Sequence, residues 1–380
     1  MIGTGFAASS HVDALRRVPG VEIAAIAGRS AERTAAAARA LGVERAVDDW
    51  RRLVDDPGIE AVHDCTPNHL HAEINAAVLD AGKPLLSEKP LGMDAAETAD
   101  LVRRADAAGV VSGVCFNYRH FPLVQEARAL LAAGETGPAH LIRGGYLQDW
   151  LLEETDWNWR LESSLAGATR ALGDIGSHWI DLLQHVTGRR MARVLARLGR
   201  LHDVRRRPAA AARTFGRAAD EAAEPIEVDT EDFATVMFEL EDGCPGVFTV
   251  SQVSPGLRNR LTFEIDTRRA CLQWDQERPN RLWIGRRDGP NRELVRDPAL
   301  LGEPAARLVH FPPGHQEGWP DALRNLMDDF YAAVRDGAPA PATVASFADA
   351  HRVMQAVEAI AESGRSGRWV EVGAAAEVPA

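Results

Sequence analysis

Short apolar runs alternate with Ala-rich helical patterns along the first 120 residues of the chain. The apolar runs lie at 21–27, 59–65, 83–87 and 110–116, and the helical patterns at about 31–41, 69–81 and 94–109. Strands that alternate with helices of this length predict βαβ units and a parallel sheet. The runs carry no polar alternation, which is typical of strands covered by helices on both faces. We therefore expect a doubly wound α/β Rossmann domain over residues 1–120.

After residue 120 the pattern changes to polar and apolar alternation, interrupted by helical patterns. We expect strands at 139–149, 191–202, 231–240, 245–254, 260–266, 270–274 and 281–284, and helices at 122–133, 173–186, 321–335 and 343–363. Turn residues between the runs predict hairpins. Residues 121–380 are thus predicted to form an α+β domain with a large, mostly antiparallel open sheet, for substrate binding and oligomerisation. Residues 203–229, poor in large apolar side chains, are expected to be a mobile loop.

A glycine-rich turn opens the chain. GTGFAA (3–8) fits G-x-G-x-x-G/A, in which Gly3 permits the tight turn and Gly5 lets a pyrophosphate approach the backbone. We expect Gly3, Gly5, Phe6 and Ala7 to bind a dinucleotide at the start of the following helix. Only Met1 and Ile2 precede the turn, so either the first strand is very short or it is truncated and the natural chain begins upstream; we favour the second.

The end of the second predicted strand concerns cofactor choice. A carboxylate about 20 residues after the glycine turn would bind the ribose 2′-hydroxyl of NAD. This chain has Gly28-Arg29-Ser30 there, with Arg33 one helical turn later. A guanidinium and a hydroxyl favour a 2′-phosphate, so we expect NADP over NAD. The alternative is that Arg29 stacks on the adenine and NAD binds as well.

The composition bounds the class of protein. The 380 residues are enough for two domains, and the net charge of −12 argues against nucleic acid or an anionic membrane as partner. The four cysteines lack metal-binding spacing, and His69 and His71 diverge on a helix, so no metal site is expected. We find no apolar run of membrane-spanning length and no signal peptide, and expect a cytoplasmic location.

Lysine use marks one position for chemistry. Of 43 basic residues only two are lysines, Lys83 and Lys89, both within AGKPLLSEKPLG. Lysine, unlike arginine, can shift its pKa and release a proton when it is desolvated. Lys83 stands in an ordinary helix-to-strand turn. Lys89 is therefore the stronger candidate for a role in catalysis.

A second candidate lies in GDIGSHWIDLLQHV (173–186), which reads as a helix. Asp174, His178, Asp181 and His185 form one polar stripe, and Ile175, Trp179, Leu182 and Val186 form an adjacent stripe expected in the core. Asp174 can fix the tautomer of His178 one turn later, a pair suited to taking a proton from a hydroxyl. For Asp181 and His185 a solvated face is expected. His63 is expected to be a core histidine.

With these motifs in hand, the chain resembles the glucose–fructose oxidoreductase, inositol 2-dehydrogenase and rhizopine-catabolism (Gfo/Idh/MocA) family over essentially its whole length. GTGFAA, TPNHLH (66–71), AGKPLLSEKPLG and GDIGSHWIDL carry the resemblance in the expected order. It implies that the cofactor is bound by residues that follow the predicted strands and by two from a DWNWR segment. These are Thr66, Pro67, Asn68, His71, Glu88, Lys89, Asn117, Trp159 and Arg160.

The resemblance also implies a reaction. Lys89 would contact the reacting oxygen, and Asp174 and His178 would transfer the proton. Weaker candidates for the substrate rim are Tyr118, Arg119, Trp157 and His315. We expect an NAD(P)-dependent dehydrogenase acting on a carbinol of a sugar, cyclic polyol or glycoside, in a homodimer or homotetramer. A redox-assisted glycosidase or lyase with a tightly held cofactor, and a catalytically silent sugar sensor, remain alternatives.

Overall fold

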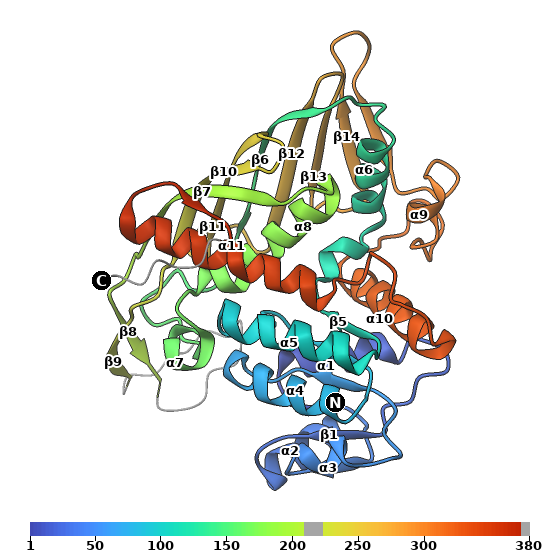
Figure 1. The fold of residues 1–380 in the computed structure, drawn as a ribbon, viewed down its shortest axis with the longest axis vertical. Helices are drawn as coiled ribbons and strands as arrows, with labels where there is room; N and C mark the ends of the chain where they lie inside the picture. The colour runs from blue at the N-terminus through green and yellow to red at the C-terminus, as the bar shows by residue number, and fades with distance from the viewer. Residues whose placement is uncertain (209–222, 374–380) are drawn as a thin grey trace. The chain divides into compact units, whose positions relative to one another are not determined.

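The computed structural model describes residues 1–208 and 223–373, which form two compact units (Figure 1). The first unit contains Met1–His120 and Gly318–His351, and the second contains Phe121–Glu317 and the chain from Arg352 onward. The expected division placed everything after residue 120 in the second domain. Residues 318–351 instead belong to the first, because the helix they contain packs on its core.

The first unit is built on a parallel sheet. Its strands are β1 (Ala25–Ala27), β2 (Arg45–Val47), β3 (Val62–Asp64), β4 (Leu85–Ser87) and β5 (Ser112–Val114). β1 pairs with β2, and β3, β4 and β5 pair in that order, all parallel. Ile2 bridges to Ala27 on one side and Asp64 on the other, and so joins the two groups. The order β2-β1-Ile2-β3-β4-β5 is that of a Rossmann fold, as predicted.

Helices cover this sheet. They are α1 (Phe6–Leu15), α2 (Ala31–Ala40), α3 (Arg51–Val54), α4 (His71–Asp80), α5 (Ala95–Ala108) and α10 (Trp319–Asp336), with short 3₁₀ turns η1 (Asn68–Leu70) and η2 (Asn117–His120). α10 buries Leu323, Leu326, Met327 and Phe330, the spacing of one helix face. These side chains join Val12 and Leu15 of α1 in one apolar cluster. That burial explains why residues 318–351 complete the first unit.

The second unit contains the predicted large sheet. Its strands are β6 (Ala139–Leu147), β7 (Met191–Gly199), β10 (Phe233–Leu240), β11 (Pro245–Ser251), β12 (Arg260–Thr267), β13 (Cys271–Asp275), β14 (Arg281–Gly285), β15 (Arg292–Val295) and β16 (Val370–Glu371). They lie in the order β15-β14-β13-β12-β6-β11-β10-β7-β16. Only β11 and β6 pair in parallel. The predicted fold class is therefore confirmed in both units.

Helices accompany the sheet of the second unit. They are α6 (Pro122–Ala132), α7 (Ser163–Ala166), α8 (Ser177–Thr187), α9 (Glu303–Ala306) and α11 (Phe347–Ser366), which begins in the first unit, with turns η3 (Trp159–Leu161) and η4 (Leu172–Gly176). Trp179 of α8 lies on the sheet and stacks on Phe248, with ring centroids 4.2 Å apart. A Cβ at Gly144 would come within 2.8 Å of the Trp179 indole nitrogen. This glycine therefore permits the close approach of α8 to β6 (Figure 1).

The region 203–229 differs from the expected loop. β8 (Val204–Arg207) and β9 (Glu224–Glu227) pair as an antiparallel hairpin at its two ends. Their sequences, VRRR and EPIE, lack the apolar residues that would have predicted strands. Residues 209–222, the middle of the expected mobile loop, lie outside the described chain.

Candidate functional site

The residues expected to bind a cofactor in the first unit follow the carboxyl ends of its strands. Arg29 comes after β1, Thr66 after β3, Glu88 and Lys89 after β4, and Asn117 after β5. Ligands of open α/β sheets bind at this edge. The fold thus brings together positions that are up to 114 residues apart in the sequence, from Gly3 to Asn117.

The glycine turn has the geometry that a pyrophosphate requires. Gly3 has φ +111°, and a Cβ there would lie 2.4 Å from the Cys65 carbonyl oxygen, so no other residue fits. A Cβ at Gly5 would meet nothing within 4 Å. Gly5 is also the N-cap of α1, and no side chain caps that helix end. Open space beside uncapped amides suits an anion, and Phe6 and Ala7 supply the first of them.

The turn after β1 leaves no room for an acidic side chain at its start. A Cβ at Gly28 would lie 2.6 Å from the Thr34 hydroxyl and 2.9 Å from the Thr4 methyl group. Arg29 and Arg33 are exposed. The Ser30 hydroxyl accepts a hydrogen bond from the Arg33 amide at 3.4 Å and so caps α2.

The TPNHLH segment is fixed by His71. Its buried ring contacts two backbone oxygens, that of Pro90 through Nδ1 at 2.6 Å and that of Thr66 through Nε2 at 2.8 Å. Both partners are carbonyl oxygens, one in the loop after β3 and one in the loop after β4. His71 therefore ties these two loops together. Asp64 Oδ1 accepts from the Thr66 hydroxyl at 2.7 Å, and burial raises the pKa of this carboxyl.

The two lysines differ as expected. Lys83 Nζ donates to the carbonyls of Asp56 at 2.5 Å and Ile59 at 2.9 Å, which is a structural role. Lys89 lies partly buried at the carboxyl edge, directly after Glu88. The Lys89 amide donates to Glu88 Oε2 at 3.1 Å, so the side chain of Glu88 turns back over its own loop.

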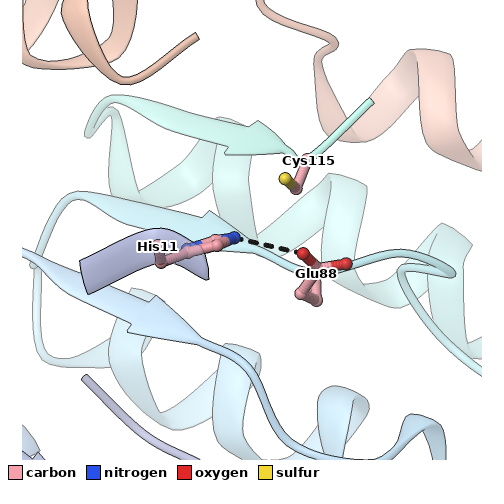
Figure 2. Close-up of side chains that lie close together, drawn as sticks. All are labelled: His11, Glu88 and Cys115. Atoms are coloured by element: carbon pink, nitrogen blue, oxygen red, sulfur yellow. Dashed lines mark hydrogen bonds and ion pairs between the residues drawn. The ribbon is translucent and has the colours of Figure 1, made fainter. Parts of the chain in front are cut away.

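Glu88 belongs to a cluster with His11 and Cys115 (Figure 2). Their ligating atoms all lie within 4.8 Å of one another, and His11 Nε2 is 3.1 Å from Glu88 Oε1. Burial raises the pKa of the Cys115 thiol well above its usual value. Burial alone would raise the pKa of Glu88 too, but the hydrogen bond from His11 and the charge of Lys89 outweigh it and bring the pKa to about 2.

Two of the weaker substrate candidates are buried. Tyr118 is 3% exposed and Arg119 is 4% exposed. Arg119 Nη1 binds Asp349 Oδ2 at 3.2 Å and the Ala342 carbonyl at 3.3 Å, both within the first unit. These contacts anchor Arg119 within the first unit, and its expected place at a substrate rim stays a prediction. Asn117, also buried, has an amide nitrogen with no hydrogen-bond partner in the described chain, as a ligand-binding group would.

In the second unit, Asp174 lies in η4, a single π-helical turn before α8. Turns of this kind recur at functional sites. Gln252 Nε2 donates to Asp174 Oδ2 at 2.9 Å, and Arg160 Nε lies 3.2 Å from Oδ1. The Arg160 guanidinium in turn lies 4.6 Å from the Trp159 ring centre. His178, one turn after Asp174, is 8% exposed.

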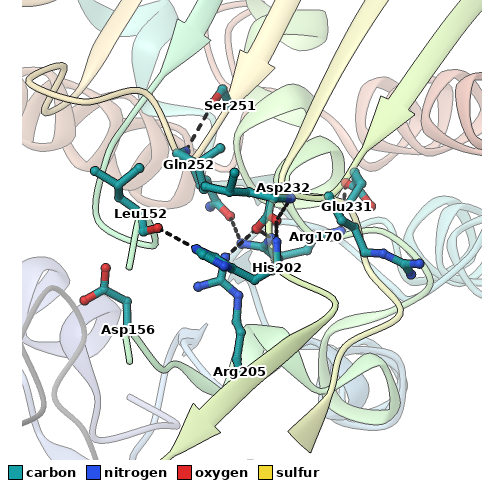
Figure 3. A network of polar contacts seen from close by, with 12 residues as sticks. Leu152, Asp156, Arg170, His202, Arg205, Glu231, Asp232, Ser251 and Gln252 are labelled. Carbon is teal, nitrogen blue, oxygen red and sulfur yellow. Dashed lines mark hydrogen bonds and ion pairs between the residues drawn. The ribbon is translucent and has the colours of Figure 1, made fainter. Parts of the chain in front are cut away.

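A buried charged network supports Gln252 (Figure 3). Arg170 Nη1 donates to Gln252 Oε1 at 3.0 Å, and its Nη2 binds Asp232 Oδ1. Arg205 Nη2 binds the same Asp232 oxygen at 2.6 Å. Burial alone would raise the pKa of Asp232, but the two guanidinium charges lower it. Glu231 accepts from the amides of Arg170 and Leu172, which fixes the start of η4.

The polar stripe of α8 requires a correction. Asp181 and His185 are 2% and 4% exposed, not solvated. His185 Nε2 lies 2.8 Å from Gln125 Nε2 of α6, and Arg128 binds its carbonyl. Packing of α6 on α8 therefore covers a face that sequence alone assigns to solvent. The adjacent stripe of Ile175, Trp179, Leu182 and Val186 is buried, as predicted.

The two remaining substrate candidates, Trp157 and His315, differ in their exposure. Trp157 is 8% exposed and packs in an apolar cluster with Leu151, Leu161 and Val228, so it serves the core of the second unit. Its expected place among the substrate contacts stays a prediction. His315 is exposed, with Nδ1 3.2 Å from the Pro312 carbonyl.

Comparison with known proteins identifies the family. Residues 1–116 match the oxidoreductase family with an NAD-binding Rossmann fold, and residues 124–273 match the GFO/IDH/MocA C-terminal domain. A levoglucosan dehydrogenase of Pseudarthrobacter phenanthrenivorans is 31% identical over 393 aligned residues, covering 98% of this chain and 97% of that protein. The chain belongs to the Gfo/Idh/MocA family.

Comparison with solved structures agrees with this assignment. An oxidoreductase domain protein from Kribbella flavida has a TM-score of 0.88 at 32% identity, covering 98% of this chain and 97% of the other. Levoglucosan dehydrogenase in complex with NADH and levoglucosan has a TM-score of 0.87 at 30% identity, with 98% of each chain covered. The predicted oxidoreductase class and the nicotinamide-dinucleotide domain are thereby confirmed. Within the described residues, no helix is both long and apolar enough to cross a membrane.

Sequence reasoning missed three groups in this Gfo/Idh/MocA chain. His11 is buried on α1 and contacts Glu88, Asp64 is buried after β3, and Gln252 contacts Asp174. His11 could have been noticed as a histidine on the inward face of α1, with Ala8 and Leu15. Gln252 carried no signal, because its partner lies 78 residues away.

Proposed function

We propose that this protein oxidises a secondary hydroxyl of a cyclic sugar, of the anhydrosugar or glycoside type, by hydride transfer to a nicotinamide cofactor. The observation that carries the proposal is the Asp174 carboxylate, held by Gln252 and Arg160 one helical turn before a nearly buried His178. A carboxylate fixed on both oxygens is suited to orient an imidazole for repeated proton transfer. The full-length relative whose name specifies levoglucosan supports the sugar class.

The proposed reaction assigns a separate role to each group. His178 accepts the proton of the substrate hydroxyl, and Lys89 donates a hydrogen bond to the same oxygen as negative charge develops on it. A nicotinamide cofactor bound in the first unit would supply the hydride acceptor for the carbinol carbon, and the product would be a carbonyl compound. Gly3, Gly5, Phe6 and Ala7 would hold the pyrophosphate, and Glu88 and Asn117 would lie at the nicotinamide half. Asp174 orients His178 and exchanges no proton with the substrate.

The proposal includes a preference for NADP over NAD. Gly28 excludes a side chain at its position, and Arg29 and Arg33 are exposed at the turn where a ribose 2′-phosphate would lie. The similar levoglucosan dehydrogenase was solved with NADH, so both cofactors must be compared. We expect a higher kcat/KM with NADP, and an inverted preference in Arg29→Asp. Equal use of NAD by the wild type and no change in Arg29→Asp would remove this part of the proposal.

The test is an assay of reduced nicotinamide formation with NAD and NADP against levoglucosan, inositols, pyranoses and glycosides. With the best substrate, Lys89→Arg and His178→Asn should each lower kcat by about 100- to 10,000-fold, the usual contribution of acid–base groups. Lys83→Arg and His185→Asn are matched controls, one on the other lysine and one on the same helix, and should retain turnover. Near-wild-type turnover in Lys89→Arg would exclude its role.

The same assay separates the alternatives. Turnover of a glycoside without net formation of reduced cofactor would indicate the redox-assisted glycosidase or lyase. Binding of sugar and cofactor with no turnover of any substrate would indicate a sensor. A homodimer or homotetramer is part of the proposal, and analytical ultracentrifugation of the purified protein tests it.

A further inference from the structure

Four buried or partly buried polar side chains of the first unit form a continuous chain. His11 Nε2 lies 3.1 Å from Glu88 Oε1, and His11 Nδ1 lies 2.9 Å from His63 Nδ1. His63 Nε2 lies 3.0 Å from the Tyr331 hydroxyl. Both histidines are buried, at 0% and 3% exposure. The chain runs from α10 through β3 and α1 to the loop after β4, and Figure 2 shows its end at Glu88.

The direction of each hydrogen bond follows from what each group can donate. Glu88 is a carboxylate and only accepts, so His11 Nε2 carries a proton and donates to it. With His11 neutral, its Nδ1 accepts from His63 Nδ1–H, and His63 Nε2 accepts from the Tyr331 hydroxyl. A second proton on His11 would reverse the direction of the His11–His63 and His63–Tyr331 hydrogen bonds. The hydrogen bond from His11 to Glu88 would stay the same. Burial raises the pKa of Tyr331 and lowers that of His63, so both remain neutral.

The position of Glu88 connects this chain to the cofactor. In a Rossmann fold the two halves of the sheet bind the two halves of the dinucleotide, with the pyrophosphate at the first glycine turn. Arg29 lies in the half with β1 and β2, next to the expected adenosine. Glu88 follows β4 in the other half, where the nicotinamide would lie. The oxidised nicotinamide ring carries a positive charge that the reduced ring lacks, so a carboxylate beside it stabilises the oxidised form selectively.

We propose that His11, His63 and Tyr331 are positioning residues that hold the Glu88 carboxylate toward the nicotinamide and so favour binding of the oxidised cofactor over the reduced one. The inference rests on the proposed function, since it requires a dinucleotide at this edge. It assigns no proton transfer to the chain: Tyr331 orders His63, His63 orders His11, and His11 holds the charge.

A metal ion is the competing explanation of the same cluster. His11, Glu88 and Cys115 could supply three ligands, but an ion would replace the His11–Glu88 hydrogen bond, and Cys115 is a protonated thiol in the present arrangement. The hydrogen-bond chain explains His63 and Tyr331 as well, whereas a metal ion leaves both without a role.

The experiment is equilibrium binding of the oxidised and the reduced cofactor to the intact protein, without substrate, by isothermal titration calorimetry. The pair used is NAD+ and NADH or NADP+ and NADPH, whichever the wild type binds. His11→Leu should weaken oxidised relative to reduced binding by about 10-fold, the effect of losing a hydrogen bond to a charged group. His63→Phe should have a smaller effect and Tyr331→Phe the smallest. His11→Gln, whose amide can donate in place of Nε2, should restore most of the wild-type ratio.

The pH dependence adds a result that a packing defect would not produce. Glu88 faces His11 from α1, Lys89 from its own loop, Asp64 and Cys65 from the end of β3, and Cys115 from the end of β5. With its pKa near 2, Glu88 stays ionised in the wild type. The ratio of oxidised to reduced cofactor binding should therefore be constant from pH 5.5 to 8. In His11→Leu only the charge and the amide of Lys89 still oppose burial, so the pKa of Glu88 should rise and the ratio of oxidised to reduced binding should fall as the pH falls. Asp64 is present in both the wild type and His11→Leu, so its own titration affects both proteins equally.

The control is Thr98→Val. It removes a buried hydroxyl that lies 2.9 Å from His351 Nδ1 and does not belong to the hydrogen-bond chain of Glu88, His11, His63 and Tyr331. It should leave the ratio of oxidised to reduced cofactor binding unchanged. Absence of dinucleotide binding to the wild type would refute the proposed function itself. Binding with an unchanged ratio in folded His11→Leu, at every pH, would overturn the inference. So would a loss of binding on chelation that zinc restores. If His11→Leu does not fold, His63→Phe decides: its ratio of oxidised to reduced binding should be lower than that of His11→Gln, and an equal ratio in these two variants would overturn the inference.

Discussion

Each unit supports its candidate residue with a buried polar network, but the two networks use different chemistry. Glu88 is held by histidines and a tyrosine, of which His63 and Tyr331 are neutral, while Asp174 is held by Gln252 and, behind it, two arginines on Asp232. The first network ends in one carboxylate, and His63 and Tyr331 contribute no charge to it. The second is made of charges that cannot be lost at working pH, because arginine does not deprotonate. The comparison teaches that a carboxylate can be positioned either through a chain of hydrogen bonds that includes uncharged groups or through a set of permanent charges.

The largest expected effect concerns the charged network. Asp232→Asn leaves Arg170 and Arg205 buried without their shared carboxylate, and should destabilise the second unit by about 3–5 kcal/mol, as for other broken buried ion pairs. Urea unfolding measures the loss, and hydrogen exchange of peptides from β10 and β11 locates it. A loss below that of an ordinary surface substitution would mean that the network contributes specificity alone. The second variant replaces Arg170, Arg205 and Asp232 together by apolar residues, which removes all three charges and leaves none of them unpaired.

The next effect separates geometry from stability. Gln252→Leu removes the donor to Asp174 and should lower kcat by about 10- to 100-fold, the effect of a lost hydrogen bond to a charged group. The dissociation constant of the cofactor should change far less than kcat, because Gln252 contacts Asp174, which is assigned to orienting His178 and not to binding the cofactor. Gln276→Leu is the control, since its buried side-chain oxygen has no hydrogen-bond partner in the described chain. Equal turnover in the two variants would contradict a positioning role for Gln252.

The pH response should distinguish the two networks. The pKa of His63 is well below its usual value, chiefly through burial. The unfolded chain binds a proton at this position below about pH 6.5, and the folded one does not, so stability is lost as the pH falls through that value. His63→Gln should flatten the decline between pH 6.5 and 5 by at most about 1.4 kcal/mol per pH unit. Asp232, with a lowered pKa, keeps its contribution until the pH falls below about 4.

Thermal unfolding of the wild type and His63→Gln across this range, with hydrogen exchange of peptides from β3 and α10, tests that difference. A parallel decline in both proteins would show that His63 takes up its proton without unfolding the first unit.

The smallest effect provides the reference. Arg193 and Glu239 form a bidentate pair at 2.9 and 2.7 Å on the sheet of the second unit, and their side chains are 42% and 29% exposed. Solvent screens such pairs, so Glu239→Gln should leave the unfolding midpoint unchanged within error. A shift comparable with that of Asp232→Asn would remove the distinction between buried and exposed pairs on which the comparison rests.

Much of the candidate site could be predicted because local sequence dictates it. Gly3 must be glycine for steric reasons, and the glycine turn, the loops after β3 and β4, and the helix from Asp174 are each short continuous motifs. The errors occurred where a distant element decides. Asp181 and His185 are buried where a solvated face was expected, and His185 contacts Gln125 of α6. No local pattern encodes those neighbours.

The sequence by itself determined the two-unit α/β and α+β architecture and the glycine turn, and it singled out Lys89 over Lys83 as the candidate for chemistry. These depend on periodicity and on backbone sterics, which act over a few residues. Only the tertiary structure decided that α10 completes the first unit, that His11 and Tyr331 lie in one chain with Glu88, and that Gln252 holds Asp174. Hydrogen bonds between side chains act over about 3 Å, and residues 320 positions apart, such as His11 and Tyr331, join one chain only after folding.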